Sequence, residues 1–527
     1  MPRSIDPRRL VNYKANRLYL DYIEERGTLI KTYFTHAPNA FHAAFAARRA
    51  EPYPRQKLVE VLKPYNASHG AGRRALENIE ALAEPTTFCV VSGQQAGFLG
   101  GAAYTAHKII TTIRLAARLE EYLGGRFVPL FWLASEDHDF GEINHAYLTQ
   151  PDGEVGQVSF GWRDKGRPIA DLPLTEAVAQ AYDEYFERLL PGPFHAEVKE
   201  RFAPQPDETY CAWHARIWAE LFADQGLVIV EPHVLRPLGG DVFHRALSLG
   251  VELHRHLDDV ARRLELAGYQ PALAPGRAGD LYTFDKGGQR VRIETPEVHL
   301  DQVSKHPERY SADAALRPLF ADRLLPTVAS VLGPGEIAYQ AMLKPLYKLF
   351  ELPQPILFPR KSYTVLSSVQ AERLADYDVD VPTVLRGELD IGQAFEALLP
   401  TDPQALFDQA REASAQALEP LRAYVEGIDP SLVRTWEQTL YYSQDNLDKL
   451  EARAMKARMS QEGLSKAQLR SLRNALLPRG RLQERVFPLP HFLNQFGFSF
   501  LDELLSIGEL DDFSHHILTL EVNDVER

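Results

Sequence analysis

The sequence predicts an α/β protein with a parallel sheet in residues 1–365, followed by a long helical arm. A β-branched run at residues 88–91 breaks into a glycine-rich turn and then into a helical pattern at residues 102–123. An apolar strand at residues 127–134 follows this helix, which completes a βαβ unit. After Val365 the pattern becomes alanine-rich and helical. These observations place the fold in the α/β class with an appended helical hairpin.

The composition is that of a soluble globular protein with about two or three domains. The chain has 527 residues, of which 45% are hydrophobic, and a formal net charge of -14. This charge argues against a nucleic-acid partner, and an anionic ligand would need a locally basic pocket. The charged start lacks the apolar core of a signal peptide, and no run of about 18 apolar residues predicts a membrane span. We therefore expect a cytoplasmic protein.

The first strand leads into glycines that suit an anion, because Gly93, Gly97, Gly100 and Gly101 allow a ligand close to the backbone. Neither the G-x-G-x-x-G nor the Walker spacing is present, so a tight turn without a ligand stays open as an alternative. Polar side chains crowd this turn and favour a ligand: Ser92, Gln94, Gln95, Tyr104, Thr105, His107 and Lys108. In open parallel sheets, ligands bind at the carboxyl ends of strands such as this one.

The second strand ends in a cluster of acids around a histidine. Trp132 lies within the strand, and Glu136, Asp137, His138 and Asp139 follow it. A histidine between carboxylates can act as a general base or bind a metal, whereas a solvated loop is the alternative. The only cysteines are Cys89 and Cys211, which lie far apart, so we expect no zinc site and no disulfide scaffold.

The remaining strands of the sheet are separated by insertions at about residues 143–225 and 233–324. The first insertion contains a predicted hairpin at residues 143–160, and a buried strand is predicted at residues 226–232. A strand ending near Leu332 leads into a sharp turn and a helix, and a last strand at residues 355–358 ends in a cationic pair. Candidate ligand-binding residues in these segments are Gly335, Glu336, Tyr339, Lys344 and Arg360.

Residues 366–475 are predicted to form an antiparallel helical arm. Apolar or small residues recur at alternating four- and three-residue spacing from Trp436 to Ala454, which is typical of a packing or dimer seam. The final segment, residues 476–527, begins with basic residues and is expected to return to the sheet.

Several motifs together resemble the bacillithiol-synthesis BshC family over nearly the whole chain. The motifs are Ser92-Gly-Gln-Gln-Ala-Gly97, Tyr104-Thr105, Phe131-Trp-Leu-Ala-Ser-Glu-Asp-His-Asp139, Gly333-Pro-Gly-Glu-Ile-Ala-Tyr339, Pro359-Arg360 and Leu482-Gln-Glu-Arg485. The resemblance implies a Rossmann-like core with inserted connecting segments, akin to class I aminoacyl-tRNA synthetases. It also implies a coiled-coil arm that forms a homodimer.

The resemblance further implies a ligase that joins L-cysteine to the amino group of glucosaminyl-malate, with ATP activating the cysteine carboxylate and Mg²⁺ accompanying the nucleotide. The synthetase signature His-Ile-Gly-His is replaced here by Phe98-Leu-Gly-Gly101, which departs from the adenylation pattern. Two other hypotheses remain: a metal-dependent hydrolase using the cluster at residues 136–139, and a non-catalytic nucleotide-binding dimer.

The expected roles follow from polarity and position. Gln94, Gln95, Tyr104, Thr105 and His107 are assigned to the nucleotide or cysteine. Asp137, His138 and Asp139 would orient an amine, with His107 as a further catalytic candidate, while Arg360 and Lys344 would balance anionic charge. The other expected binding residues are Ser92, Gly93, Gly97, Trp132, Glu136, Gly335, Glu336 and Tyr339.

Overall fold

The computed structural model describes residues 3–11, 13, 16–136, 139–162, 166–273, 278–398, 401–461 and 463–521. The chain forms two compact units. One comprises Met1–Ser368 together with Leu477–Arg527, and the other comprises Val369–Leu476. The C-terminal segment therefore belongs to the same unit as the sheet.

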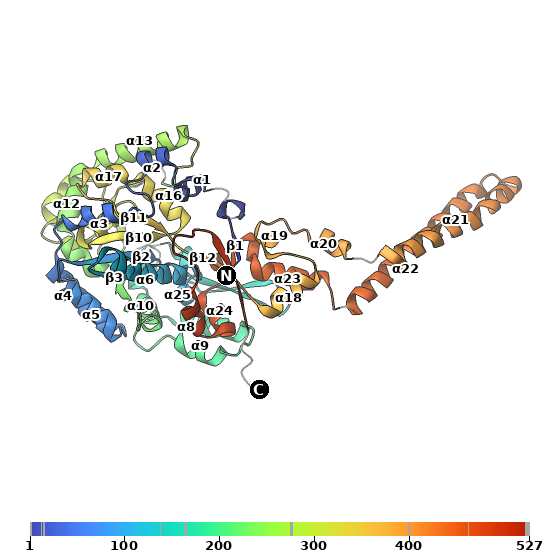
Figure 1. Ribbon diagram of the computed structural model, residues 1–527, viewed down its shortest axis with the longest axis horizontal. Helices are drawn as coiled ribbons and strands as arrows, with labels where there is room; N and C mark the ends of the chain where they lie inside the picture. The colour runs from blue at the N-terminus through green and yellow to red at the C-terminus, as the bar shows by residue number, and fades with distance from the viewer. Residues whose placement is uncertain are drawn as a thin grey trace. The chain divides into compact units, whose positions relative to one another are not determined.

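A five-stranded parallel sheet forms the centre of the first unit (Figure 1). Its strands are β2 (Thr87–Gln94), β3 (Arg126–Leu133), β6 (Val228–Val230), β10 (Thr327–Leu332) and β11 (Ile356–Pro359). Their order is β11-β10-β2-β3-β6, so the chain progresses outward from β2 in one direction and then returns to the other side through β10. This is the Rossmann order, and its reversal point lies between β2 and β10. The prediction of a Rossmann-like parallel sheet is confirmed.

Helix α6 (Tyr104–Leu123) connects β2 to β3 and begins two residues later than predicted. It packs on the sheet, where its Leu115 and Leu119 share a fully buried core with Phe88 and Val90. The region before β2 is helical, with α1 (Arg17–Ile23), α2 (Gly27–Tyr33), α3 (Phe41–Arg49), α4 (Arg55–Ser68) and α5 (Arg73–Ala81). α1 ends before Glu25, whose φ of 53° lies in the left-handed region, and α2 starts a new helix at Gly27.

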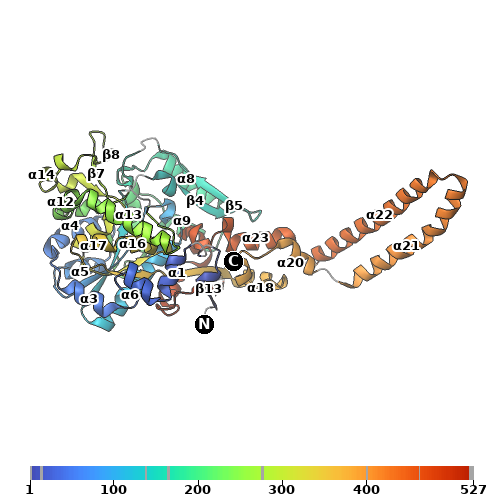
Figure 2. The ribbon, with the colours of Figure 1, turned by 90° about the horizontal axis from the view of Figure 1, so that it is seen from above.

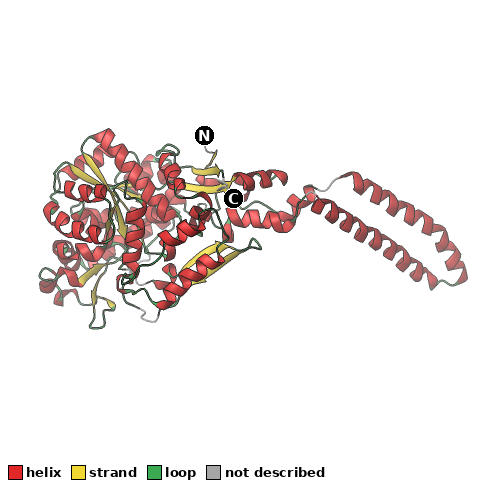
Figure 3. Cartoon of the chain, turned by 90° about the horizontal axis from the view of Figure 1, so that it is seen from below, coloured by secondary structure: helices red, strands yellow, loops and turns green. Residues whose placement is uncertain are grey.

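The two insertions lie between β3 and β6 and between β6 and β10. The first carries the predicted hairpin, β4 (His145–Thr149) and β5 (Val155–Ser159), with α7 (Phe140–Ile143), α8 (Glu176–Arg188), α9 (His195–Arg201) and α10 (Tyr210–Leu221). The second carries α11 (Pro232–Leu235), α12 (Gly240–Leu249), α13 (Val251–Leu266), α14 (Leu300–Val303) and α15 (Leu316–Leu324). It also carries β7 (Leu281–Phe284) and β8 (Arg290–Arg292), together with β9 (Tyr310–Ala312), which pairs with β7. Figure 3 distinguishes the strands of the chain, in yellow, from its helices, in red.

A second, three-stranded sheet had not been predicted. It contains β1 (Arg3–Ile5), β12 (Ser362–Ser367) and β13 (His515–Leu520). β12 follows β11 after two residues, pairs in parallel with β13, and β13 pairs antiparallel with β1. These pairings join the two ends of the chain, which explains why no single segment of sequence revealed them. After α16 (Pro334–Met342) and α17 (Lys344–Leu349), the unit closes with α24 (Leu489–Phe496) and α25 (Ser499–Ser506).

The second unit contains the predicted helical hairpin, in which α21 (Thr401–Ile428) and α22 (Leu432–Gln461) run side by side (Figure 2). Trp436 Nε1 donates to the Leu418 carbonyl at 2.8 Å, and the Ser414 and Ser443 hydroxyls lie 2.6 Å apart. Shorter helices complete the unit: α18 (Ser368–Asp376), α19 (Val381–Leu385), α20 (Ile391–Ala397) and α23 (Lys466–Leu476). Within the described residues, no helix combines the length and apolar character that crossing a membrane requires.

Candidate functional site

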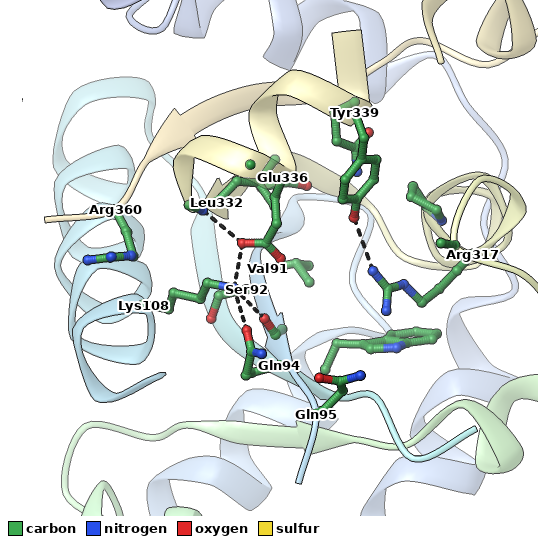
Figure 4. Close-up of a pocket in the computed structure, with 18 of the residues that line it drawn as sticks. Val91, Ser92, Gln94, Gln95, Lys108, Arg317, Leu332, Glu336, Tyr339 and Arg360 are labelled. Carbon is green, nitrogen blue, oxygen red and sulfur yellow. Dashed lines mark hydrogen bonds and ion pairs between the residues drawn. The ribbon is translucent and has the colours of Figure 1, made fainter. Parts of the chain in front are cut away.

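A cavity of about 470 Å³ opens at the reversal point of the sheet (Figure 4). It lies between the carboxyl ends of β2 and β10 and is closed by the first turns of α6 and α16. The structure brings many of the predicted binding residues to its wall: Ser92, Gly93, Gln94, Gln95, Tyr104, Trp132, Gly335, Glu336, Tyr339 and Arg360. These residues were predicted because they lie at or after the ends of strands, and this criterion therefore identified much of the cavity wall.

Lys108 and Glu336 form a bridge across the reversal point. Lys108 Nζ lies 2.5 Å from Glu336 Oε2 and donates to the Gly93 carbonyl at 2.9 Å and to Gln94 Oε1 at 2.8 Å. The same Glu336 oxygen accepts from the Gly333 backbone at 2.8 Å (Figure 4). Burial lowers the pKa of Lys108, and the Glu336 carboxylate opposes that shift. The bridge thus ties the turn after β2 to the start of α16.

Several buried polar atoms of this wall have no hydrogen-bond partner among the described residues. They are Ser92 Oγ, Trp132 Nε1 and Gln340 Oε1, on side chains that are each at least 95% buried. Leaving such groups unpaired is unfavourable, and native proteins satisfy nearly all of them. These three unpaired groups belong to residues that line one cavity, which favours a polar ligand there.

Arg360 lines the cavity, but its positive charge is paired with the buried carboxylate of Glu484. Its Nη1 and Nη2 donate to the Glu484 carboxylate at 3.1 and 2.7 Å. Glu484 also accepts from the Ser362 hydroxyl and the Tyr363 backbone. Burial alone would raise the pKa of Glu484, but Arg360 and the His107 hydrogen bond hold it well below its usual value. Arg360 is therefore one half of a buried ion pair.

Three cationic side chains surround the Tyr104 ring at one corner of the cavity. Lys108 Nζ lies 5.7 Å from the ring centroid, and the guanidinium carbons of Arg360 and Arg485 lie 5.4 and 5.8 Å away. On the opposite wall, Arg317 donates to the Tyr339 hydroxyl at 3.0 Å (Figure 4). A chain with an overall negative charge thus gathers its cations where an anionic ligand would bind.

The glycine turn after β2 packs closely on itself. A Cβ on Gly97 would lie 2.7 Å from the Gly101 Cα, so these glycines serve the close packing of the turn on itself. At the start of α6, the Ala103 backbone donates to the Phe487 carbonyl at 2.9 Å, and Ala102 bridges to Pro488. The C-terminal segment thus occupies the helix end that binds phosphate in many Rossmann folds.

Other predicted site residues lie away from the cavity wall. Buried His107 bonds through Nδ1 to Glu484 at 2.9 Å, and burial lowers its pKa. Lys344 donates to the carbonyls of Lys31 and Phe34, and Glu136 pairs with Arg236 at 2.5 Å. Thr105 is buried and Asp139 is exposed, and neither is among the lining residues. Asp137 and His138 lie outside the described residues.

Sequence reasoning missed part of the site: Arg317, Gln340, Glu484 and Arg485 were not assigned, and Lys108 was noted without a role. Lys108 follows Tyr104 by one helical turn, so its position on the same face was a usable signal. Glu484 gave no such signal, since its partner Arg360 lies 124 positions earlier in the chain. Within the described ranges, no group of three or more His, Cys, Asp or Glu is placed to hold a metal ion.

The parallel sheet, its reversal point and the cavity there define a Rossmann-like α/β protein with a small-molecule site. Residues 7–361 match the model "Bacillithiol biosynthesis BshC, N-terminal Rossmann-like domain", and residues 363–520 match "Bacillithiol biosynthesis BshC, C-terminal coiled-coil domain". The chain therefore belongs to the BshC family.

Curated relatives align with this chain over nearly their full length. A protein of Geobacillus kaustophilus named "Putative cysteine ligase BshC" is 31% identical over 91% of this chain and 93% of its own. Proteins of the same name from Bacillus cytotoxicus and Salinibacter ruber are 29% and 30% identical, over 95% and 91% of this chain and 97% and 91% of their own.

Proposed function

We propose that this chain is a ligase that joins L-cysteine to the amino group of glucosaminyl-malate and so forms bacillithiol. The observation that carries the proposal is the cavity at the sheet reversal, with its unpartnered Ser92, Trp132 and Gln340 atoms and its gathered cations. The family to which the chain belongs, and the name of its relatives, supply the reaction class. The proposed compartment is the cytoplasm.

The chemistry requires activation of one partner and deprotonation of the other, because a carboxylate and an ammonium ion do not condense in water. ATP is the proposed source of activation and would turn the cysteine carboxylate into a better acyl donor. The start of α6 is covered, so the start of α16 and Lys108 are the groups that would hold phosphate. At Gly335, no atom beyond its chain neighbours and the backbone of its own helix lies within 4 Å of the place a Cβ would occupy, which leaves room for close approach.

The unpaired buried groups of the cavity and the polar residues that follow β3 have different proposed tasks. Ser92 Oγ and Trp132 Nε1 would donate to oxygen atoms of the bound substrates, and Gln340 Oε1 would accept from an amine. Asp137, His138 and Asp139 stay proposed as residues that orient an amine or take its proton. Glu136 is not free for that task or for a metal, because Arg236 holds its carboxylate.

We further propose that the helical hairpin forms a homodimer. Large apolar side chains of this unit are exposed in the single chain: Leu406, Leu421, Tyr424, Ile428, Tyr441, Tyr442 and Leu450. Such a gathering of exposed apolar groups on one unit is typical of an interaction surface.

The test is mass spectrometry of purified protein incubated with cysteine, glucosaminyl-malate and ATP, with nucleotides measured in the same run. The proposal expects bacillithiol, with AMP if an adenylate forms or ADP if an acyl phosphate forms. Folded protein that binds a nucleotide yet makes no product would instead support the non-catalytic hypothesis. Product formed without ATP would contradict the proposed activation.

A further inference from the structure

The short turn Gln483–Arg485 is anchored by its first two side chains. Gln483 Oε1 accepts from the Val365 backbone at 2.7 Å, and its Nε2 donates back to the Val365 carbonyl at 2.9 Å. Glu484 is 1% exposed and holds Arg360, His107 and Ser362. Two buried polar side chains, one bonded to the edge of β12 and one paired with a cation, fix the backbone of this turn.

The third residue of the turn, Arg485, consequently extends to the cavity. It is exposed, it lines the cavity, and its guanidinium lies over the Tyr104 ring. In the part of the chain that the structure describes, Arg485 has no hydrogen bond or ion pair. Lys108 and Arg360, by contrast, are each paired with a carboxylate, that of Glu336 and that of Glu484. Arg485 therefore has a full positive charge to offer to a ligand.

The position of Arg485 decides which anionic group it can reach. The reacting carboxylate of cysteine has to lie where activation occurs, beside buried groups such as Ser92 and Lys108. Arg485 is exposed whereas Lys108 is 2% exposed, so Arg485 lies on the solvent side of the cavity, where a ligand part remote from the reaction would lie. In the proposed acceptor, that remote part carries carboxylates, and guanidinium binds a carboxylate with two parallel hydrogen bonds.

We propose that Arg485 binds the carboxylate end of the acceptor substrate and thereby selects an acidic amino sugar over a neutral one. This inference rests on the proposed function and adds a specificity-determining residue from the C-terminal segment. Gln483 and Glu484 act through Arg485, as positioning residues. The binding step involves no covalent change.

The kinetic test compares Arg485→Gln with Arg481→Gln, which removes an exposed arginine of the same segment that does not line the cavity. Arg485→Gln should raise KM for glucosaminyl-malate about ten- to a hundredfold and leave KM for cysteine unchanged. With methyl glucosaminide, which lacks a carboxylate, kcat/KM should be the same for wild type and variant. Arg485→Lys should recover part of the loss, because it keeps the charge without the bidentate geometry.

A binding measurement separates this inference from the proposed function, since it requires no turnover. Calorimetry with L-malate should show binding to the wild type and to Arg481→Gln, and binding about tenfold or more weaker to Arg485→Gln. Arg485-dependent malate binding by a protein that makes no bacillithiol would sustain the inference and defeat the ligase proposal. Equal malate affinity in wild type and Arg485→Gln would overturn the inference, and so would a loss of ATP affinity in place of malate affinity.

Discussion

Lys108 and Glu336 face each other across the reversal point of the sheet, with Nζ 2.5 Å from Oε2. One comes from the helix after β2 and the other from the helix after β10, so the pair joins the two halves of the Rossmann-like sheet. Lys108 is 2% exposed, and its other contacts are the Gly93 carbonyl and the Gln94 amide oxygen. A buried ion pair contributes little net stability, so its place at a ligand cavity points to a role in binding.

Ser92→Ala should weaken ligand binding without destabilising the protein. The Ser92 hydroxyl has no partner among the described residues, so its removal loses no internal hydrogen bond. We expect the free energy of unfolding to stay within about 0.5 kcal/mol of wild type or to rise. Substrate affinity should fall about tenfold. Urea unfolding and calorimetry measure the two effects, and a clear loss of stability with unchanged affinity would show that the hydroxyl serves the fold.

Gly335→Val should produce a stable protein that cannot bind its ligand. No atom beyond its chain neighbours and the backbone of its own helix lies within 4 Å of a Cβ built at Gly335. The position lines the cavity, so the new side chain would fill ligand space. Gly161→Val is the matched control, because that glycine is equally open but lies outside the cavity lining. Melting temperatures of both variants should match wild type, while only Gly335→Val loses activity. Full activity of Gly335→Val would mean that the substrate binds elsewhere.

His515 should make the protein less stable in acid. Burial lowers its pKa to about 4 from an ordinary 6.5, with Glu484 opposing and His516, Arg360 and His107 adding small effects. Between pH 6.5 and 4 the unfolded chain binds a proton that the folded chain does not, so stability falls as the pH falls. At pH 5 this costs about 2 kcal/mol relative to pH 7.5.

The variant His515→Gln lacks this titration. Its deficit in unfolding free energy relative to wild type should therefore shrink by about 2 kcal/mol between pH 7.5 and pH 5, as measured by urea unfolding. A deficit that stays constant across this range would show that His515 titrates normally in the folded protein.

The double change Tyr441→Asp and Tyr442→Asp should convert the proposed dimer into a monomer. Both side chains are more than 60% exposed in the single chain, and a new charge in an apolar interface is strongly unfavourable. Leu266→Asp is the control, since Leu266 is 84% exposed on α13 in the other unit. Light scattering coupled to gel filtration gives the mass of each. A dimer that survives the double change would place the interface outside this surface.

Much of the fold could be predicted because it rests on local patterns. The strand, turn and helix around residues 88–123 and the spacing after Trp436 are periodic within one segment, and both gave the observed elements. The second sheet could not be found this way, since β12 pairs with β13 about 150 positions later, as in Ser362 with His515.

The candidate site also contains residues that the sequence could predict and residues whose surroundings it could not predict. Gln94, Tyr104 and Glu336 follow strand ends and reach the cavity, as their positions indicated. Gly97 had the right residue type, but its task is close packing against Gly101. Lys344 has the positive charge that an anionic ligand would need, and it follows α16 closely in the sequence. Its ammonium group, however, donates to two backbone carbonyls and does not line the cavity. Charge and residue type alone do not reveal which direction a side chain faces.

The most direct test of the central claim is product formation by Lys108→Met and Lys344→Met in one mass-spectrometric assay. Both changes remove a lysine charge and keep an unbranched apolar side chain, but only Lys108 lines the cavity at the sheet reversal. We predict that Lys108→Met lowers bacillithiol formation by roughly a hundredfold or more, while Lys344→Met stays within about threefold of wild type. Wild-type product formation by a folded Lys108→Met protein would contradict the assignment of this cavity as the active site.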